Sequence, residues 1–447
     1  MCIIVNRGHM MDRSRMERQI GDAMRHASTT RAILSERGSL QALPAQSAQL
    51  FPGHSFFLVA DEHTWDAAGR TVAAVLQSAS VPVCARHVFP GEPMLEADHI
   101  HALALARMFS EHEDAIPIAI GSGTINDLVK LAAHLSNRPY ICVATACSVD
   151  GYASDGAALL TEGTKMTHHC PAPALIIGDP VVLDKAPPIL NASGYADLMA
   201  KIPAGADWIL ADHLGEAPID PVAWSMVQTN LRDWLSDPQD SGAIFTGLTL
   251  CGIAMQYMRD SRPVSGAEHL LSHIWEMEHL RNQGTAVLHG IKVGIGSPIV
   301  TAVYERLFRL GIEGGEPLLP TSEQLGRKLS LAPRLFGTSM DLSAIGNTIS
   351  VKYGREGREV QRRGLLLSDW HALKKKLQQQ LLGFGQMASS LSAAGCPVTP
   401  QGIGLDTPHA LATLRKAQLI RNRYTILDAL EDLGLMDATI RDLDCFS

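Results

Sequence analysis

The feature that most constrains the fold is a regular alternation of short apolar runs with longer helical patterns between residues 55 and 145. The apolar runs have the length of strands and occupy 55–60, 81–89, 115–120 and 140–145. The segments between them have the apolar spacing of helices and occupy 64–79, 95–113 and 126–135. Strands joined by helices of this length form parallel sheets with helices on both faces. We therefore expect an α/β N-terminal domain with a Rossmann-like parallel sheet.

The second half of the chain has a different pattern. A hairpin turning at 162–163 and one more buried strand before 179–180 close the strand-rich part. Long segments with apolar residues at three- and four-residue spacing follow, at 221–236, 243–260, 267–282, 286–310 and 369–382. This spacing predicts helices. We expect a nucleotide-binding α/β domain at 1–185 and an all-helical C-terminal domain at 186–447.

The composition excludes several classes of protein. Lys and Arg total 38 against 46 Asp and Glu, which gives a formal net charge of -8. A nucleic acid is therefore not an expected partner, and the basic run 355–363 is interpreted as a solvated helix face. The sequence has no run of about 18 consecutive apolar residues, so we expect no membrane span. Without a visible secretory signal or a C-x-x-C pair, we expect a cytoplasmic protein.

A glycine-rich turn, Gly121-Ser122-Gly123-Thr124, follows one predicted strand and precedes a predicted helix. Such a turn can bring backbone N–H groups close to a diphosphate at the start of the helix. The usual dinucleotide fingerprint has a third glycine where this chain has Asn126, so a purely structural turn remains an alternative.

Further polar residues follow neighbouring strands at the same edge of the predicted sheet. The strand at 140–145 leads into a loop that carries Thr145, Ser148 and Ser154, and the strand at 55–60 ends at Asp61. Open α/β sheets bind ligands at the carboxyl ends of their strands, so a nucleotide crevice is plausible here. Asp61 either accepts hydrogen bonds from a ribose or caps the following helix, and both interpretations stay open.

A second constellation lies in the helical half. It consists of Asp197, His269, His273 and His289, which lie in separate predicted helices except for the two histidines four residues apart. A carboxylate and imidazoles from different helices suit a divalent metal with one open position. With 18 histidines in the chain, unrelated structural histidines remain the alternative at this point.

Five ordered motifs together resemble the sn-glycerol-1-phosphate dehydrogenase family, within the wider group of iron-containing alcohol dehydrogenases and dehydroquinate synthases. The motifs are GSGTINDLVK (121–130), ATACSVDGYAS (144–154), GYADLMAKIPAGADW (194–208), SRPVSGAEHLLSH (261–273) and LHG (288–290). The resemblance extends over most of the chain. It implies an NAD(P)-dependent oxidoreductase whose active site lies in the cleft between the two domains.

The resemblance also implies roles for individual residues. Asp197, His269 and His289 match metal ligands, and Asp150, Asp197 and His273 match substrate contacts. Contacts with NAD(H) or NADP(H) are implied for Asp61, Gly121, Ser122, Gly123, Thr124, Thr145, Ser148 and Ser154. We also expect Arg262 and Lys292, which flank the metal motifs, to bind the phosphate of the substrate. The expected metal is Zn²⁺, with Ni²⁺ and Fe²⁺ as alternatives that accept the same ligands.

The expected reaction is hydride transfer between the cofactor and the pair dihydroxyacetone phosphate and sn-glycerol 1-phosphate. Another phosphorylated or phosphonate ketone, a dehydroquinate synthase-like lyase and a nucleotide-binding regulator are the alternatives. The acidic ligand Asp197 favours the dehydrogenase, because dehydroquinate synthases typically have glutamate there. We expect a homo-oligomer, a dimer or larger.

Overall fold

The structure is a computed structural model that describes residues 13–161, 164–337 and 340–443. The chain forms two compact units. Unit 1 comprises the residues before Met199 together with Ser225–Ser261, and unit 2 comprises Met199–Trp224 and Arg262–Ser447. The predicted turn at 162–163 lies outside the described residues. Among the described residues, no helix is both long enough and apolar enough to cross a membrane.

Unit 1 is built on a six-stranded sheet in which every neighbouring pair of strands is parallel. Its strand order is β1-β8-β5-β4-β2-β3. The strands are β1 (Ala32–Leu34), β2 (Ser55–Asp61), β3 (Val83–Phe89), β4 (Ala115–Gly121), β5 (Ile141–Ala144) and β8 (Leu175–Ile177). The predicted parallel α/β sheet is therefore confirmed, and β1 is a strand that the alternation did not predict.

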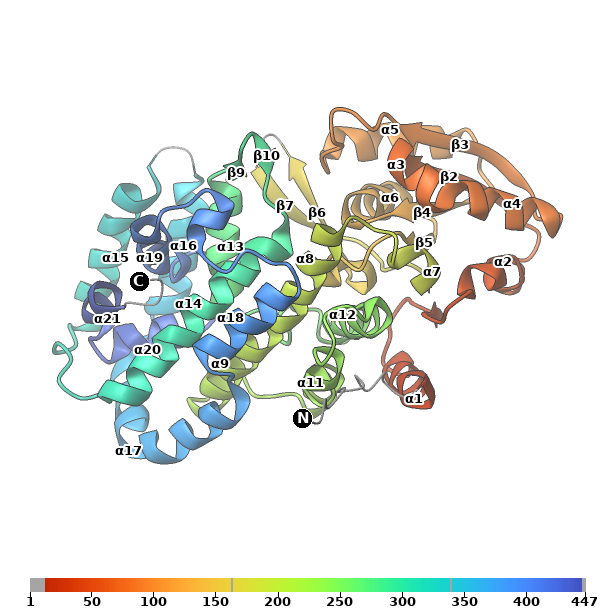
Figure 1. The fold of residues 1–447 in the computed structure, drawn as a ribbon. Coiled ribbons are helices and arrows are strands. Elements are labelled where there is room, and N and C mark those ends of the chain that lie inside the picture. Colours follow the sequence, from red (N-terminus) through yellow and green to blue (C-terminus); the bar gives the residue numbers. More distant parts are fainter. Residues whose placement is uncertain (1–12, 162–163, 338–339, 444–447) are drawn as a thin grey trace, which may run out of the picture. The chain divides into compact units, whose positions relative to one another are not determined.

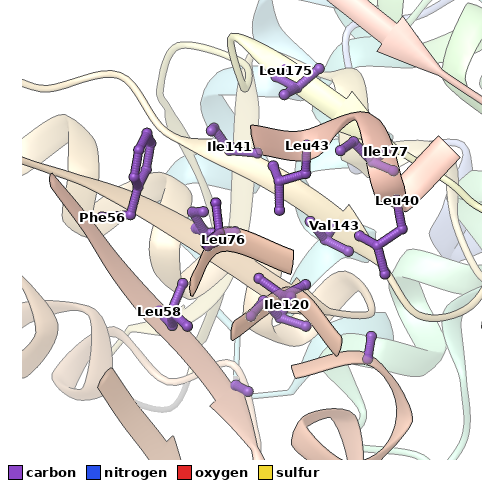
Figure 2. Packing of buried hydrophobic residues seen from close by; sticks show 14 of the residues in the cluster. Leu40, Leu43, Phe56, Leu58, Leu76, Ile120, Ile141, Val143, Leu175 and Ile177 are labelled. Carbon is purple, nitrogen blue, oxygen red and sulfur yellow. The ribbon is translucent and has the colours of Figure 1, made fainter. Parts of the chain in front are cut away.

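Helices cover both faces of this sheet (Figure 1). They are η1 (Ser39–Ala42), α2 (Leu43–Leu50), α3 (Glu62–Thr64), η2 (Trp65–Gly69), α4 (Arg70–Ser78), α5 (His99–Ser110) and α6 (Gly123–Leu135). Alternate residues of β2 point to opposite faces. Phe56 and Leu58 pack with Leu43 of α2 and Leu76 of α4 in one apolar cluster, part of which Figure 2 draws. On the other face Phe57 meets Phe109 of α5 at a ring distance of 5.2 Å.

The strand order reverses between β2 and β4, because the chain leaves β2 toward β3 and then returns to add β4 on the other side. Val59 pairs with Ala119, and two residues later β2 ends at Asp61 and β4 at Gly121. Asp61 and the glycine turn therefore lie together at the carboxyl edge. Ligands of open α/β sheets bind at such a point.

The rest of unit 1 follows the sheet and includes part of the predicted helical half. The hairpin β6 (Gly156–Thr161) and β7 (Thr164–His169) is antiparallel. The helices are α1 (Arg13–Met24), η3 (Asp150–Ala153), α7 (Pro180–Leu183), α8 (Pro188–Met199), α11 (Leu231–Trp234) and α12 (Ser241–Met258). Compact packing thus extends unit 1 beyond residue 185, because α12 packs against η3 and α1. The predicted functional boundary at 185 stays a prediction.

Helix α8 lies in direct contact with the loop that follows β5. A Cβ atom on Gly194 would lie 1.7 Å from the carbonyl oxygen of Cys147, so only glycine permits this approach. The Ser193 hydroxyl donates to the carbonyl of Ser148 over 3.1 Å. These contacts fix α8 one turn before Asp197.

Unit 2 is mainly helical, as predicted. Its main elements are α9 (Lys201–His213), α13 (Ala267–Met277), α14 (His289–Leu310), α15 (Thr321–Phe336), α16 (Leu342–Tyr353), α17 (Arg358–Gln380), α18 (Phe384–Ala393), η4 (Pro400–Ile403), α19 (Thr407–Ala417), α20 (Ile426–Asp432) and α21 (Met436–Asp442). The short strands β9 (Arg281–Asn282) and β10 (Thr285–Ala286) join α13 to α14, and α10 (Pro221–Gln228) spans a boundary between the units.

We predict that Gly194→Ala lowers the free energy of unfolding by about 1–3 kcal/mol, because the added methyl group forces α8 away from the Cys147 carbonyl. Urea unfolding of both proteins measures the change. Gly326→Ala is the matched control, since that helical glycine has open space around its Cβ position and should give a small stabilisation. Equal stability of wild type and Gly194→Ala would contradict the close approach.

Candidate functional site

Three side chains bring potential metal ligands together: Asp197 of α8, His269 of α13 and His289, the first residue of α14. One ligand atom from each lies within 4.8 Å of the other two. Asp197 and His269 are buried, and His289 is partly exposed. One carboxylate oxygen and two imidazole nitrogens at this spacing are a donor set for a divalent cation that keeps a coordination position open.

The two helices that carry the histidines are packed closely. A Cβ atom on Gly296 of α14 would lie 2.7 Å from the backbone oxygen of Glu268 on α13. Helix α14 begins at His289, so its first residue lies beside α13. The ring centroids of His269 and His289 are 5.5 Å apart.

Each histidine of the trio has a carboxylate partner at Nδ1. The Nδ1 of His269 is 2.8 Å from Oε1 of Glu268, and the Nδ1 of His289 is 2.8 Å from Oε1 of Glu276. A carboxylate accepts a hydrogen bond, so each Nδ1 carries the proton and each Nε2 keeps a lone pair. Metal-binding histidines have this second partner as a rule, and the residues therefore fit a metal ion.

His273 lies one turn after His269 on α13. Its Nδ1 is 3.3 Å from Oε2 of Glu276, and 30% of its side chain is exposed. Loss of water around the ring lowers the pKa of His273, and the positive charge of Arg421 acts in the same direction, while Glu276 opposes both. His273 is therefore neutral at pH 7 and can accept a proton.

The carboxylate of Asp197 is held from the loop that follows β5. The backbone N–H of Asp150, at the start of η3, donates to Oδ2 of Asp197 over 3.0 Å. Lys130 of α6 fixes this loop, because its buried ammonium group donates to the carbonyl oxygens of Gly151 at 2.8 Å and Ser154 at 3.0 Å. A third bond goes to Gly156 at 2.8 Å. Burial lowers the pKa of Lys130, and nearby Asp127 opposes the shift.

The glycine turn has the geometry expected of a phosphate site. Helix α6 begins at Gly123, and Ser122 before it makes no side-chain cap, so the first N–H groups of the helix have no side-chain acceptor there. A Cβ on Gly121 would lie 2.6 Å from Ile125, so glycine permits the helix to pack against the strand. The N–H of Thr145 donates to the carbonyl of Gly121 over 3.1 Å, which joins the two loops.

The remaining predicted cofactor residues have different surroundings. Asp61 caps α3, because its Oδ1 accepts from the N–H of Thr64 over 2.7 Å. Thr145 and Ser148 are buried within the loop that follows β5, and Thr124 is half-buried in the first turn of α6. The Ser154 hydroxyl donates within its own loop to Gly151 over 3.0 Å. Contacts of these residues with a cofactor stay predictions.

Comparison with known proteins identifies the family. The sequence model of the iron-containing alcohol dehydrogenases matches residues 35–187. The chain is 31% identical over 397 residues to "Glycerol-1-phosphate dehydrogenase [NAD(P)+]" of Geobacillus thermodenitrificans, covering 85% of this chain and 87% of the relative. A protein of that name from Geobacillus stearothermophilus is 30% identical over 84% of this chain and 86% of the relative. The chain belongs to the glycerol-1-phosphate dehydrogenase family. This confirms the predicted resemblance.

The fold of this family member is also similar to solved structures. Glycerol dehydrogenase from Schizosaccharomyces pombe superimposes with a TM-score of 0.54 at 14% identity, covering 93% of this chain and 90% of that chain. A sulfoacetaldehyde reductase from Bifidobacterium kashiwanohense, solved in complex with NAD+, gives a TM-score of 0.53 at 14% identity, over 94% and 99% of the two chains. At this identity the likeness establishes the fold alone.

Sequence reasoning about this family member missed the residues that hold the site together. Glu268, Glu276, Lys130 and Gly194 were not predicted. The glycine and glutamates lie inside the quoted motifs or directly after them, but a single sequence does not distinguish a buried carboxylate from an exposed one. Of the residues expected to bind phosphate, Arg262 donates to the backbone oxygen of Tyr424 over 2.9 Å, and Lys292 forms an ion pair with Glu276 at 3.1 Å.

A second buried carboxylic acid, Asp207, lies near Glu268. Asp207 of α9 accepts from the Tyr304 hydroxyl at 2.7 Å and from the N–H of Ala267 at 2.7 Å. A Cβ atom on Gly266 would lie 2.6 Å from Oδ2 of Asp207 and 2.8 Å from Oε2 of Glu268, an oxygen that has no hydrogen-bond partner. Burial, and then the charge of Glu268, raises the pKa of Asp207 to about 7. Asp207 therefore carries a proton below about pH 7 in the folded state.

We predict that this proton makes stability depend on pH. The folded pKa of about 7 lies above the ordinary aspartate value of 3.8, so the stabilising effect is fully present below about pH 3.8 and is lost as the pH rises through 7. Between pH 5 and 8 the wild type should lose up to about 1.4 kcal/mol per pH unit relative to Asp207→Asn. Denaturant unfolding of both proteins across this range measures the difference. Parallel pH curves would contradict a raised pKa of Asp207.

Proposed function

We propose that the chain is a metal-dependent NAD(P) oxidoreductase that interconverts dihydroxyacetone phosphate and sn-glycerol 1-phosphate. One observation carries the proposal: Asp197, His269 and His289 offer ligand atoms within 4.8 Å of one another in a member of the glycerol-1-phosphate dehydrogenase family. A cytoplasmic location and a homo-oligomeric assembly stay predictions.

The proposed metal ion is Zn²⁺, held by Asp197, His269 and His289. When bound, the ion stabilises negative charge on the substrate oxygen, and the nicotinamide of NAD(P) gives or takes the hydride. The donor set of one carboxylate and two neutral imidazoles supports zinc, although Ni²⁺ and Fe²⁺ accept the same ligands.

The proposed cofactor site is the carboxyl edge of β2, β4 and β5. The N–H groups at the start of α6 bind the diphosphate, and Gly121 lets this helix begin close against the end of β4. Asp61 uses Oδ1 as a helix cap, and we propose that Oδ2 accepts a hydrogen bond from the ribose. Ser148 and Thr145 line the adjoining loop.

The substrate contacts follow from the same groups. His273, with its proton on Nδ1, accepts the substrate hydroxyl proton at Nε2 during oxidation and returns it during reduction. Asp150 contacts the substrate from the loop beside Asp197. The lowered pKa of His273 keeps the ring neutral at pH 7, with Nε2 unprotonated before the transfer.

We propose Arg421 as the residue that binds the substrate phosphate. Its segment is anchored close to the start of α13, because Arg423 donates to the carbonyl of Ser265 over 2.6 Å and Arg262 donates to that of Tyr424. Arg421 itself is exposed, and its charge acts on His273. Arg262 therefore positions this segment, whereas Arg421 offers a guanidinium group that can bind two phosphate oxygens.

Purified protein with NADH and dihydroxyacetone phosphate should consume NADH continuously, and His269→Ala should lower turnover at least about a hundredfold while NADH binding stays unchanged. Absorbance of NADH and its fluorescence on binding measure the two effects. No net consumption of NADH would point to a transient role of the cofactor and contradict the dehydrogenase. If NADH is oxidised only with a different phosphorylated or phosphonate ketone, that ketone replaces dihydroxyacetone phosphate as the proposed substrate.

Arg421→Gln should raise the KM for dihydroxyacetone phosphate by about 10- to 100-fold, because one charge-assisted phosphate contact is lost. The KM for NADH should not change. Arg327→Gln, which removes an exposed arginine on α15, is the matched control and should leave both constants as they are. An unchanged KM for the ketone in Arg421→Gln would remove this residue from the phosphate site.

A further inference from the structure

The carboxylate of Glu276 contacts His289, Lys292 and His273, all in unit 2. Oε1 accepts from Nδ1 of His289 at 2.8 Å and lies 3.1 Å from Nζ of Lys292, while Oε2 accepts from Nδ1 of His273 at 3.3 Å. Only 5% of the Glu276 side chain is exposed. One buried group thus contacts a proposed metal ligand, a proposed proton acceptor and a cation.

This arrangement sets the same tautomer in both histidines. A carboxylate offers only acceptors, so His289 and His273 each place their proton on Nδ1 and leave Nε2 with a lone pair. The two rings are nearly parallel, with an interplanar angle of 28° and centroids 6.1 Å apart. The two oxygens of one carboxylate therefore hold both rings.

We propose that Glu276 is a positioning residue that orients both His289 for metal binding and His273 for proton transfer. The inference rests on the proposed function and deepens it. In this role Glu276 acts through the two imidazoles that it contacts.

Lys292 supplies the positive charge that pairs with the carboxylate of Glu276. Its side chain is only 8% exposed, and its charge lies 3.1 Å from Oε1 of Glu276. An unpaired buried carboxylate is costly, and the pair lowers that cost. Lys292 is thereby assigned to Glu276 rather than to the substrate phosphate.

Glu268 provides an internal contrast on the same helix. Its Oε1 accepts from Nδ1 of His269 and from the N–H of Gly266, both at 2.8 Å. Glu268 therefore orients one metal ligand, whereas Glu276 orients a metal ligand and His273 together. Loss of either glutamate should weaken metal binding, but only loss of Glu276 should also impair proton transfer.

The test compares Glu276→Gln with Glu268→Gln and with the control Glu278→Gln. An amide has a single acceptor oxygen, so in Glu276→Gln one of the two imidazoles loses its acceptor. Glu278 also contacts a histidine and a lysine, His409 and Lys416, but lies outside the site. Zn²⁺ affinity of the metal-free proteins is measured by competition with a chromophoric chelator, and kcat is measured at saturating Zn²⁺ over a range of pH.

We expect Glu276→Gln and Glu268→Gln each to bind Zn²⁺ about 10- to 100-fold more weakly, and Glu278→Gln to bind it as the wild type does. At saturating Zn²⁺ the kcat of Glu268→Gln should recover. The kcat of Glu276→Gln should stay at least about tenfold low with an altered pH profile. Unchanged Zn²⁺ affinity in Glu276→Gln, or full recovery of its kcat, would overturn the inference.

Two further arrangements keep the test decisive. If Glu276→Gln does not fold, the double variant Glu276→Gln/Lys292→Met removes both charges together and is measured in its place. Failure of the proposed function gives a different result: the wild type would bind Zn²⁺ but would not use dihydroxyacetone phosphate. The Zn²⁺ affinities of the variants could still be compared in that case.

Discussion

The site depends on the hydrogen bonds between two buried carboxylates and the Nδ1 atoms of two histidines. An imidazole binds a cation through the nitrogen that carries no proton, so the partner of the other nitrogen decides whether the ring is a ligand at all. Glu268 accepts a hydrogen bond from Nδ1 of His269, and Glu276 accepts one from Nδ1 of His289, so Nε2 of each ring carries no proton. These hydrogen bonds orient the two rings in the absence of an ion.

The third ligand has a different origin. Asp197 depends on the packing of α8 against the loop after β5, where Gly194 removes the Cβ that would meet Cys147. The same loop is tied to α6 by the buried ammonium group of Lys130. Helix α6 also carries the glycine turn at its start, so one set of contacts joins that turn to the loop that holds the carboxylate of Asp197. A change at the turn is therefore expected to reach Asp197.

Sequence alone predicted the elements whose burial is periodic. The four strand-like runs between 55 and 145 became β2 to β5 with shifts of a few residues, because apolar runs between amphipathic helices have few other folds. Strand β1 is only three residues long and left no such pattern. The run 355–363 was interpreted as a solvated helix face, and much of it is exposed, but Arg362 is buried in an ion pair with Asp432. Charge pairs between distant segments, like the contacts of Glu276, depend on tertiary packing that a linear pattern does not encode.

The most direct test of the account is a crystal structure of the Zn²⁺-loaded protein, with anomalous scattering recorded on both sides of the zinc absorption edge. We predict one zinc peak bound by a carboxylate oxygen of Asp197 and by Nε2 of His269 and His289, at about 2.0–2.2 Å from each. Zinc bound at another position, or ligation through Nδ1 of either histidine, would contradict the central claim.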